Sequence, residues 1–396
     1  MDNTTVKFLV LSDLHAIIDK SLINDSHLLF SNEECSYAEA FKKYLFELDE
    51  NIDYIICAGD ISNKACSRGF EKGWVFLNKL KDDIGAKGLI CVPGNHDHQS
   101  RANSEVFSPK HNLQFIDPKF PTKNFKKNTN FWAWNWCALE EDSFNAFLIN
   151  SSAYHGYGDK EYEKGRVSVE TSNQIVEFIN SDKFNKKPFN LLLCHHHPYK
   201  MEHVDSKPDV ESMEYGSYLV RELHETGSGA WLVVHGHRHF ADITYAQSST
   251  DTPPLVLSAG SFSAKLYPEI EKKTSNQFYL LEIDLAKTEE RDKLIGQFST
   301  HECPYPCHWQ PSTSDNLPAK GGFGSDMTGR MISNKIRELI NDDNPFLEST
   351  ELEPFRERVE NLMPTGFKDL IKSLENHGLS VETQSNMIIE VGLKNE

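Results

Sequence analysis

The sequence lacks the features of a membrane-spanning or secreted protein. In its 396 residues, no stretch approaches the roughly 18 apolar residues that a membrane helix needs. The N-terminal segment Met1–Thr5 has neither the basic region nor the long apolar core of a signal peptide. Eight cysteines are too few for a disulfide framework in a chain of this length. Together these absences favour a cytoplasmic protein without a membrane partner.

Positive charge is also scarce. The chain carries 41 Lys and Arg against 59 Asp and Glu, which gives a formal net charge of −18. Because nucleic-acid binding by charge alone needs clustered Lys and Arg, this composition disfavours a nucleic-acid partner. The 24 Phe, 13 Tyr and 6 Trp are sufficient for a large core. They exclude a disordered or low-complexity chain.

Short apolar runs alternate with segments of helical periodicity. Apolar residues recur at helical spacing within residues 38–48, 70–80, 175–179 and 218–223. Alternating strand and helix signals predict an α/β protein. Eight runs rich in Val, Ile, Leu and Phe predict buried strands: Lys7–Leu11, Tyr54–Cys57, Leu89–Val92, Phe147–Ile149, Leu191–Cys194, Trp231–Val234, Leu255–Leu257 and Phe278–Ile283.

Two polar stretches interrupt this pattern. Gln99–Asn130 is rich in Asn, Lys, Pro and Ser and predicts a long loop or lid, whereas the alternating Trp132, Trp134 and Trp136 after it favour one face of a strand. Residues 301–325 carry four prolines and predict a linker. Beyond it, the apolar periodicity of residues 326–396 predicts a helical C-terminal extension. The expected order is therefore a domain at 1–300, a linker at 301–325 and an extension at 326–396.

The predicted linker also contains a group of possible zinc ligands. His301, Cys303, Cys307 and His308 form the pattern H-x-C-x-x-x-C-H. Structural zinc sites usually draw their ligands from two separated pairs. These four donors are crowded together with prolines between the cysteines, so we do not expect zinc there.

Polar residues typical of metal sites directly follow five of the predicted strands. In open α/β sheets, ligands bind in the crevice beyond the carboxyl ends of the strands, so these residues are expected to gather at one edge. The five blocks are Asp13-Leu14-His15, Gly59-Asp60, Gly94-Asn95-His96-Asp97, His195-His196-His197-Pro198 and Gly236-His237-Arg238-His239.

The donor types indicate the kind of metal. Carboxylate, imidazole and amide groups without a thiolate suit Mn, Fe, Ni, Co or Zn. One catalytic zinc keeps about three protein ligands, so a larger set indicates two divalent ions with one bridging carboxylate. Two ions roughly 3.5–4 Å apart can stabilise both the attacking and the leaving oxygen of an in-line displacement at phosphorus. The seven candidate ligands are Asp13, His15, Asp60, Asn95, His196, His237 and His239.

Two blocks leave choices among neighbouring residues. The H-x-P spacing selects His196 as the ligand, and strand alternation is expected to turn His195 away from the site. His197 would then face solvent or substrate. Arg238 lies between two candidate ligands, and it either attracts phosphate or faces solvent.

In order and spelling, the five blocks resemble the calcineurin-like metallophosphoesterase superfamily over about residues 6–298, and most of all its cyclic-nucleotide phosphodiesterase and small-phosphoester branches. This resemblance implies a four-layer α/β/β/α sandwich with two mixed β-sheets. It implies that Asp60 bridges two ions, that His96 contacts the substrate, and that Asp97 orients His96. His96 would steady the phosphoryl oxygens or protonate the leaving group. The resemblance places Asp13, His15 and His239 on one ion and Asn95, His196 and His237 on the other.

The same resemblance implies a metal-dependent phosphoesterase. It would hydrolyse a phosphodiester or phosphomonoester by in-line attack of a metal-bound hydroxide, with a cyclic nucleotide or another small phosphoester favoured. The superfamily also includes protein phosphatases, nucleotide hydrolases and DNA-repair exonucleases. The alternatives are therefore a metal-dependent nuclease, which the net charge disfavours, or an effector subunit. In the second case, residues 326–396 would contact a protein partner or a second copy of the chain.

Overall fold

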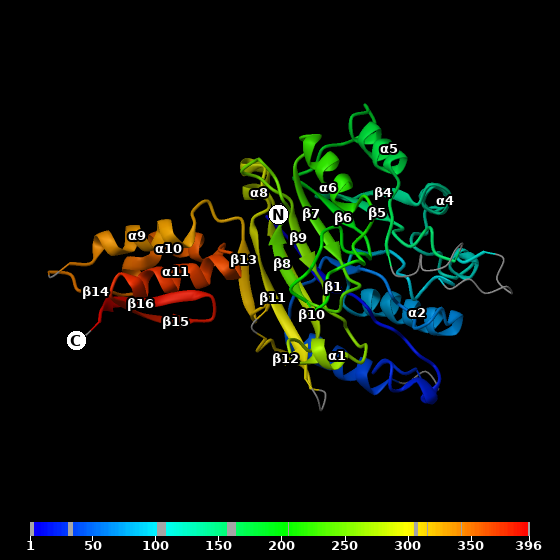
Figure 1. Cartoon of the computed structure of the whole chain (residues 1–396), viewed down its shortest axis with the longest axis horizontal. Helices are drawn as coiled ribbons and strands as arrows, with labels where there is room; N and C mark the ends of the chain where they lie inside the picture. Colours follow the sequence, from blue (N-terminus) through cyan, green and yellow to red (C-terminus); the bar gives the residue numbers. More distant parts are fainter. Residues whose placement is uncertain are drawn as a thin grey trace.

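The computed structural model describes residues 4–30, 35–100, 108–156, 164–204, 206–304, 308–314, 316–341 and 343–394. Its larger part is a sandwich of two facing β-sheets with helices against their outer faces, and a smaller unit projects from one side (Figure 1). Helices and mixed sheets confirm the predicted α/β class and the predicted two-sheet architecture.

The first sheet has the order β12-β11-β10-β1-β2-β3, with β13 paired to β11. Strands β1, β2 and β3 run parallel to one another, whereas β10 is antiparallel to β1, so the sheet is mixed. The strands are β1 (Thr5–Leu11), β2 (Tyr54–Cys57), β3 (Gly88–Cys91), β10 (Asn276–Asp284), β11 (Gly296–Cys303), β12 (Gln310–Pro311) and β13 (Lys320–Phe323).

The second sheet has the order β4-β5-β6-β7-β9-β8. Its four central strands are parallel, and β4 and β8 are antiparallel at its two edges. The strands are β4 (Trp136–Glu140), β5 (Phe144–Ile149), β6 (Phe189–Leu193), β7 (Ala230–His235), β8 (Asp242–Tyr245) and β9 (Leu255–Ser258).

Alternating side chains of the second sheet divide the core into two layers. In β5, Phe144 faces the first sheet, and its ring lies 5.2 Å from that of Phe8 in an edge-on contact. On the opposite face, Phe147 belongs to a separate hydrophobic cluster with α5 (Val169–Ile179) and α6 (Gly216–Glu225). Because successive strand residues point to opposite faces, one strand serves both layers.

Helices α1 (Ser36–Glu47) and α2 (Ser67–Asp83) belong to the cluster that contains the first sheet. The apolar residues Phe70, Trp74 and Leu77 of α2 recur every three to four positions and are buried. Such a stripe holds a helix against a sheet. The remaining helices of the sandwich are α3 (His111–Gln114), α4 (Phe125–Trp134), α7 (Pro268–Glu271), α8 (Leu285–Arg291) and a 3-10 turn, η1 (Lys20–Leu22).

All eight predicted strands are present, but the segment expected to be a loop differs. The described part of Gln99–Asn130 contains α3 and the first turns of α4. Trp132 and Trp134 lie in α4, and Trp136 begins β4, so the expectation of one shared strand face is wrong. Asn124 caps α4 by accepting a hydrogen bond from the backbone of Lys127, and this cap stabilises the start of the helix.

The segment expected to be a linker also differs from its prediction. Strand β11 continues through residue 303, and β12 and β13 pair with it, so the described parts of residues 301–325 extend the first sheet. Pro311 is tolerated in β12 because that strand lies at the edge of the sheet. Cys303 is disulfide-bonded, His301 contacts the hydroxyl of Tyr44 at 2.9 Å, and Cys307 lies outside the described residues. Neither Cys303 nor His301 is therefore available for the zinc site that we did not expect.

The C-terminal unit contains the three predicted helices together with strands that periodicity did not indicate. A three-stranded antiparallel sheet of order β14-β16-β15 packs with the helices around its own hydrophobic cluster. The extension is thus mixed rather than purely helical. Its elements are α9 (Gly329–Leu339), β14 (Phe346–Leu347), α10 (Ser349–Glu360), α11 (Pro364–Asn376), β15 (Leu379–Gln384) and β16 (Met387–Leu393).

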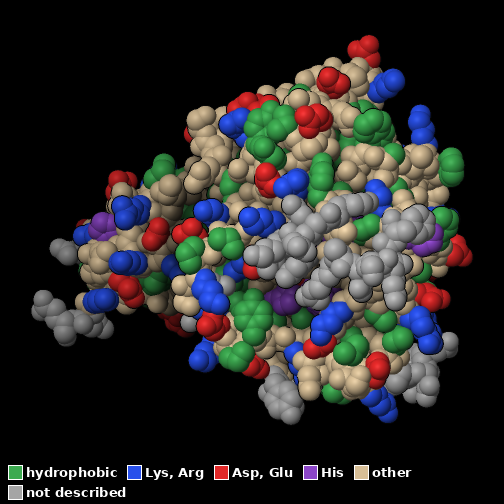
Figure 2. Space-filling view, turned by 45° about the vertical axis from the view of Figure 1, so that its right-hand side comes forward, with side chains coloured by type: hydrophobic (Ala, Val, Ile, Leu, Met, Phe, Trp, Pro, Cys, Tyr) green, Lys and Arg blue, Asp and Glu red, His purple; other side chains and the backbone are tan. Residues whose placement is uncertain are grey.

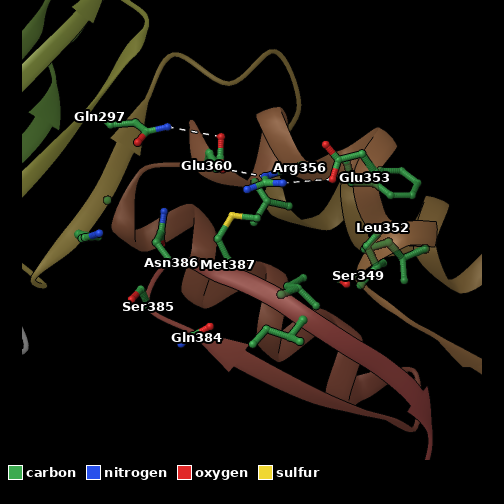
Figure 3. A pocket seen from close by; sticks show the side chains of 17 residues that line it. Gln297, Ser349, Leu352, Glu353, Arg356, Glu360, Gln384, Ser385, Asn386 and Met387 are labelled. Atoms are coloured by element: carbon green, nitrogen blue, oxygen red, sulfur yellow. Dashed lines mark hydrogen bonds and ion pairs between the residues drawn. The ribbon is translucent and has the colours of Figure 1, made fainter.

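A cavity of about 490 Å³ lies where the C-terminal unit meets the first sheet (Figure 3). Gln297 of β11 contacts Glu360 of α10 at 3.5 Å, and Arg356 pairs with the same glutamate and with Glu353. The Gln297–Glu360 contact connects the unit to the sandwich at the cavity, and the Arg356 pairs lie within α10. In the described part of the chain, no helix is both long and apolar enough to span a membrane.

Candidate metal centre

The five polar blocks meet at the carboxyl ends of β1, β2, β3, β6 and β7, and backbone hydrogen bonds hold the loops together. The backbone N–H of Asp13 donates to the carbonyl of Gly59 at 3.0 Å, and that of His15 donates to the carbonyl of Asp60 at 2.9 Å. The N–H of His237 donates to a carboxylate oxygen of Asp13 at 3.2 Å. The predicted gathering of distant residues at one edge is therefore present.

Most of the expected ligands adopt an unusual backbone conformation. Five of them have positive φ: Asp13 (52°), His15 (46°), Asp60 (51°), His237 (74°) and His239 (54°). Left-handed conformations are uncommon in residues other than glycine, cost of order 1–3 kcal/mol each, and concentrate at functional sites. The surrounding loops must therefore stabilise this backbone conformation, which places the side chains in the site.

The first group contains Asp13, His15 and His239, as expected. Nε2 of His239 lies 3.2 Å from Nε2 of His15 and 3.2 Å from Oδ1 of Asp13. Nε2 of His15 lies 3.6 Å from Oδ2 of Asp60. With metal–ligand bonds of about 2.1 Å, donor atoms around one ion lie about 3.0–3.5 Å apart. These atoms thus have the spacing of ligands around a common cation.

The second group differs from the expectation in one histidine. His195 points into the site, with Nε2 3.0 Å from Oδ1 of Asn95 and 3.3 Å from Oδ2 of Asp60. Nδ1 of His237 lies 3.2 Å from the same Asn95 oxygen. Nδ1 of His195 donates to the carbonyl of Ala58 at 2.7 Å, so Nε2 is the nitrogen that can bind an ion once its own proton is displaced.

Strand alternation was expected to point the His195 side chain away from the site, and this expectation is wrong because β6 ends at Leu193. Beyond that residue the backbone is no longer an extended strand, so the period of two does not apply. His196, the expected ligand, approaches the hydroxyl of Ser151 with Nδ1 at 2.9 Å. Within the part of the chain that the structure describes, its buried Nε2 has no hydrogen-bond partner, and His196 belongs to a cluster of possible ligands with His195 and His237.

The charges of the site fit divalent cations. Asp13 and Asp60 are buried, and Oδ1 of Asp13 has no hydrogen-bond partner among the described residues. Burial alone would raise the pKa of Asp13, but the neighbouring His239 and His15 outweigh it and hold this pKa well below its usual range. Burial likewise disfavours a charged His195, yet the carboxylate of Asp60 raises the pKa of His195 to about 10. The site therefore attracts positive charge, and the residues fit two metal ions.

His96 lies beside this centre. Its ring makes an edge-on contact with the ring of His15, with centroids 4.6 Å apart, and its backbone N–H donates to Asp60 at 2.7 Å. Nδ1 of His96 lies 3.3 Å from Oδ1 of Asn63 and 3.3 Å from the backbone nitrogen of Lys64. Burial lowers the pKa of His96 to about 3, so the imidazole is neutral at physiological pH.

Asp97 does not orient His96 as expected. Its carboxylate accepts hydrogen bonds from the backbone N–H groups of Ile61, Ser62 and Gly94 at 2.7–3.1 Å, and from the hydroxyl of Ser62 at 2.9 Å. These four donors occupy the carboxylate of Asp97. Among the hydrogen bonds of the described residues, none joins Asp97 to His96. Asp97 instead joins the loops after β2 and β3.

The remaining polar residues of the motifs are buried in a second network. His197 donates to Asp209 at 2.7 Å, and both side chains are fully buried. Arg238 is 5% exposed, and its guanidinium lies 3.0 Å from Glu211 and 3.5 Å from Asp209. Neither His197 nor Arg238 faces solvent as the sequence had allowed.

Sequence reasoning missed two residues of the site. Asn63 approaches His96, and Glu211 lies 3.5 Å from Nε2 of His237. The position of Asn63 three residues after Asp60 was a usable signal, whereas Glu211 comes from a segment without any motif.

In the space-filling view, histidine side chains reach the surface near the middle of one face, beside hydrophobic and basic side chains (Figure 2).

The profile of the calcineurin-like phosphoesterase family matches residues 6–241, more than half of the chain. In the comparison with curated proteins, none matches this chain. Among solved structures, the chain is similar to a dimetal phosphatase from Danio rerio, with 11% identity, a TM-score of 0.43, and coverage of 70% of this chain and 94% of that one.

Two further solved structures are similar. Purple acid phosphatase PPD1 from yellow lupin seeds has 13% identity and a TM-score of 0.44, with coverage of 75% of this chain and 51% of that chain. The calcineurin-like phosphoesterase YfkN from Bacillus subtilis has 11% identity and a TM-score of 0.38, with coverage of 78% and 88%.

Proposed function

The chain belongs to the calcineurin-like phosphoesterase family, a family of metal-dependent phosphoester hydrolases, and on this basis we propose that it hydrolyses a small phosphoester at a two-ion centre. The observation that carries the proposal is the convergence of carboxylate, amide and imidazole donor atoms from five loops, at separations of 3.0–3.8 Å. We favour a cyclic nucleotide or another small phosphodiester as the substrate, with a phosphomonoester as the second choice.

We propose the following ligands. Asp60 bridges the two ions because its Oδ2 lies within 3.6 Å of histidine nitrogens in both groups. The first ion takes Asp13, His15 and His239, and the second takes Asn95, His195 and His237. His195 replaces His196 in this set because only His195 approaches both Asn95 and Asp60. His196 would instead support the second ion from its edge.

Bound divalent ions would lower the pKa of water and neutralise charge that develops on the phosphoryl oxygens. The chain's own residues orient the substrate. His96 is neutral, so its role is to donate a hydrogen bond to a phosphoryl oxygen rather than to deliver a proton as an imidazolium. Several ligands have a positive φ that their loops impose. These loops keep the ligands in position before the substrate arrives, which reduces the reorganisation needed in the transition state.

The charge around the site supports a small substrate over a nucleic acid. Glu211 is 41% exposed and lies beside His237, so it adds negative charge at the edge of the centre. The net charge of −18 acts in the same direction over the whole molecule. The six described cysteines other than Cys303 are free, which supports a reducing cytoplasmic location, although the Cys303 disulfide counts against it.

The test is hydrolysis by protein loaded separately with manganese, iron, nickel, cobalt or zinc. The substrates are a chromogenic monoester, a chromogenic diester, cyclic nucleotides and single-stranded DNA. We expect turnover of the small diester and loss of at least a hundredfold in kcat/KM for Asp60→Ala. Full activity in Asp60→Ala would overturn the bridging role, and turnover of DNA alone would establish the nuclease alternative.

The C-terminal unit supports a second role, as a docking module. Residues 326–394 have a separate hydrophobic cluster, and α9 exposes 49% of Met331 and 43% of Leu339. Because β11–β13 belong to the sandwich, we propose that the phosphoesterase domain extends to about residue 325. We propose a second copy of the chain as the occupant of α9. Light scattering should show a dimer that Met331→Glu with Leu339→Glu dissociates while activity is retained, and a monomeric wild type would contradict this role.

A further inference from the structure

One acidic side chain beside the metal centre comes from a segment without a recognisable motif. Glu211 lies in the polypeptide between β6 and α6, and its Oε2 is 3.5 Å from Nε2 of His237. The other ring nitrogen of His237, Nδ1, faces the centre at 3.2 Å from Oδ1 of Asn95. One ring nitrogen of His237 therefore faces the centre, and the Glu211 carboxylate lies near the other nitrogen, in an electrostatic contact rather than an aligned hydrogen bond.

This arrangement determines where the proton of His237 lies. A histidine binds a cation through an unprotonated nitrogen, so the single proton of a neutral ring must lie on the other nitrogen. A carboxylate next to Nε2 stabilises the N–H there and leaves the Nδ1 lone pair for the ion. Glu211 thus favours the tautomer of His237 that can act as a ligand.

Contacts with two buried side chains, Arg238 and Asp209, hold Glu211 in place. Its Oε2 accepts a hydrogen bond from Arg238 at 3.0 Å, and its backbone N–H donates to Asp209 at 3.0 Å. Asp209 is buried and also accepts from His197 and from the backbone of Met201, each at 2.7 Å. The segment that carries Glu211 is therefore attached to both histidine-containing loops.

From these contacts we infer that Glu211 is a positioning residue for the second ion: it orients His237 and, with Arg238, sets how tightly that ion binds. The inference rests on the proposed two-ion centre and extends it, because it names a residue outside the five motifs that controls metal affinity. Glu211 would act on the ion through His237 and would not be a catalytic residue.

The experiment measures manganese binding to the full chain by isothermal titration calorimetry, together with the melting temperature of the metal-free protein. We expect two ions per wild-type chain and a 10–100-fold weaker second ion in Glu211→Ala, the usual effect of removing a carboxylate behind a metal-binding histidine. Glu211→Gln retains an oxygen acceptor, so its affinity should lie between the two. A structural role alone would change the melting temperature without this order of affinities.

Glu214 is the matched control. It lies three residues away, is 44% exposed against 41% for Glu211, and pairs with Arg166 at 2.7 Å. Glu214→Ala should bind both ions as tightly as the wild type. Unchanged affinity in Glu211→Ala, with two ions still bound, would overturn the positioning role and leave the proposed function intact. A wild-type chain that binds fewer than two ions would overturn the proposed function and this inference with it.

Discussion

Nε2 of His195 lies 3.3 Å from Oδ2 of Asp60, and both side chains are buried. Asp60 raises the pKa of His195 to about 10 against the opposing effect of burial. In the metal-free protein, His195 is therefore an imidazolium whose charge occupies the position proposed for an ion. A cation that binds there must displace a proton.

Manganese binding at pH 8 should release this proton, because pH 8 lies below the raised pKa. Calorimetry in two buffers of different ionisation enthalpy gives the number of protons released per ion. We expect His195→Gln to release about one proton fewer than the wild type. Equal proton release in the two proteins would show that His195 is not displaced by the ion.

The choice between His195 and His196 is tested by metal content. His195→Asn should lose the second ion, because the nitrogen that approaches Asn95 and Asp60 is removed. His196→Asn should retain both ions, since in this proposal His196 is not a ligand. Elemental analysis after dialysis against excess manganese measures both variants. Loss of an ion only in His196→Asn would return the ligand role to the histidine selected by the H-x-P spacing.

Gly94 is a position where one added methyl group should disturb a metal ligand. A Cβ there would lie 2.6 Å from the backbone nitrogen of Asp60 and 2.7 Å from its Cγ. We expect Gly94→Ala to lower kcat/KM by at least tenfold, because displacement of a ligand by less than an ångström disturbs the reacting geometry.

Gly366 in α11 provides the control for this substitution. A Cβ at Gly366 would meet only Leu362, at 3.3 Å or more, and alanine favours a helix by about 1 kcal/mol over glycine. Gly366→Ala should leave kcat/KM unchanged and not reduce stability. An active Gly94→Ala variant would show that Asp60 can shift without loss of function.

His301 should make the fold sensitive to acid. Burial lowers the pKa of His301 to about 4 from its usual 6.5. Between pH 4 and 6.5 the unfolded chain binds a proton that the folded chain does not, so the free energy of unfolding rises with pH in this window. This one group contributes at most about 1.4 kcal/mol per pH unit.

Chemical denaturation at several pH values tests this dependence. His301→Phe removes the titrating group and keeps a ring to stack on Phe278, whose centroid lies 4.8 Å from that of His301. We expect a flatter dependence between pH 4 and 6.5 in this variant, even if its stability at pH 7 is lower. Replacing the exposed His377 by Gln is the control. The same slope in His301→Phe as in the wild type would contradict the assignment.

The core strands and the positions of the site loops were predictable because their signals are local. An apolar run such as Tyr54–Cys57 can only be buried, and it coincides with β2. The edge strands were not predictable, since β12 and β13 are short and carry Pro or Gly. They exist because β11 offers them unpaired backbone groups, and that partner lies elsewhere in the chain.

By itself, the sequence determined the order of the core strands and the types of donor atom at each strand end, because these depend on neighbouring residues. Only the tertiary structure decided that His195 rather than His196 faces Asp60, that Asp97 joins two loops, and that Glu211 lies behind His237. Those choices depend on where a strand stops and on contacts between segments far apart in the chain, and no local periodicity records either.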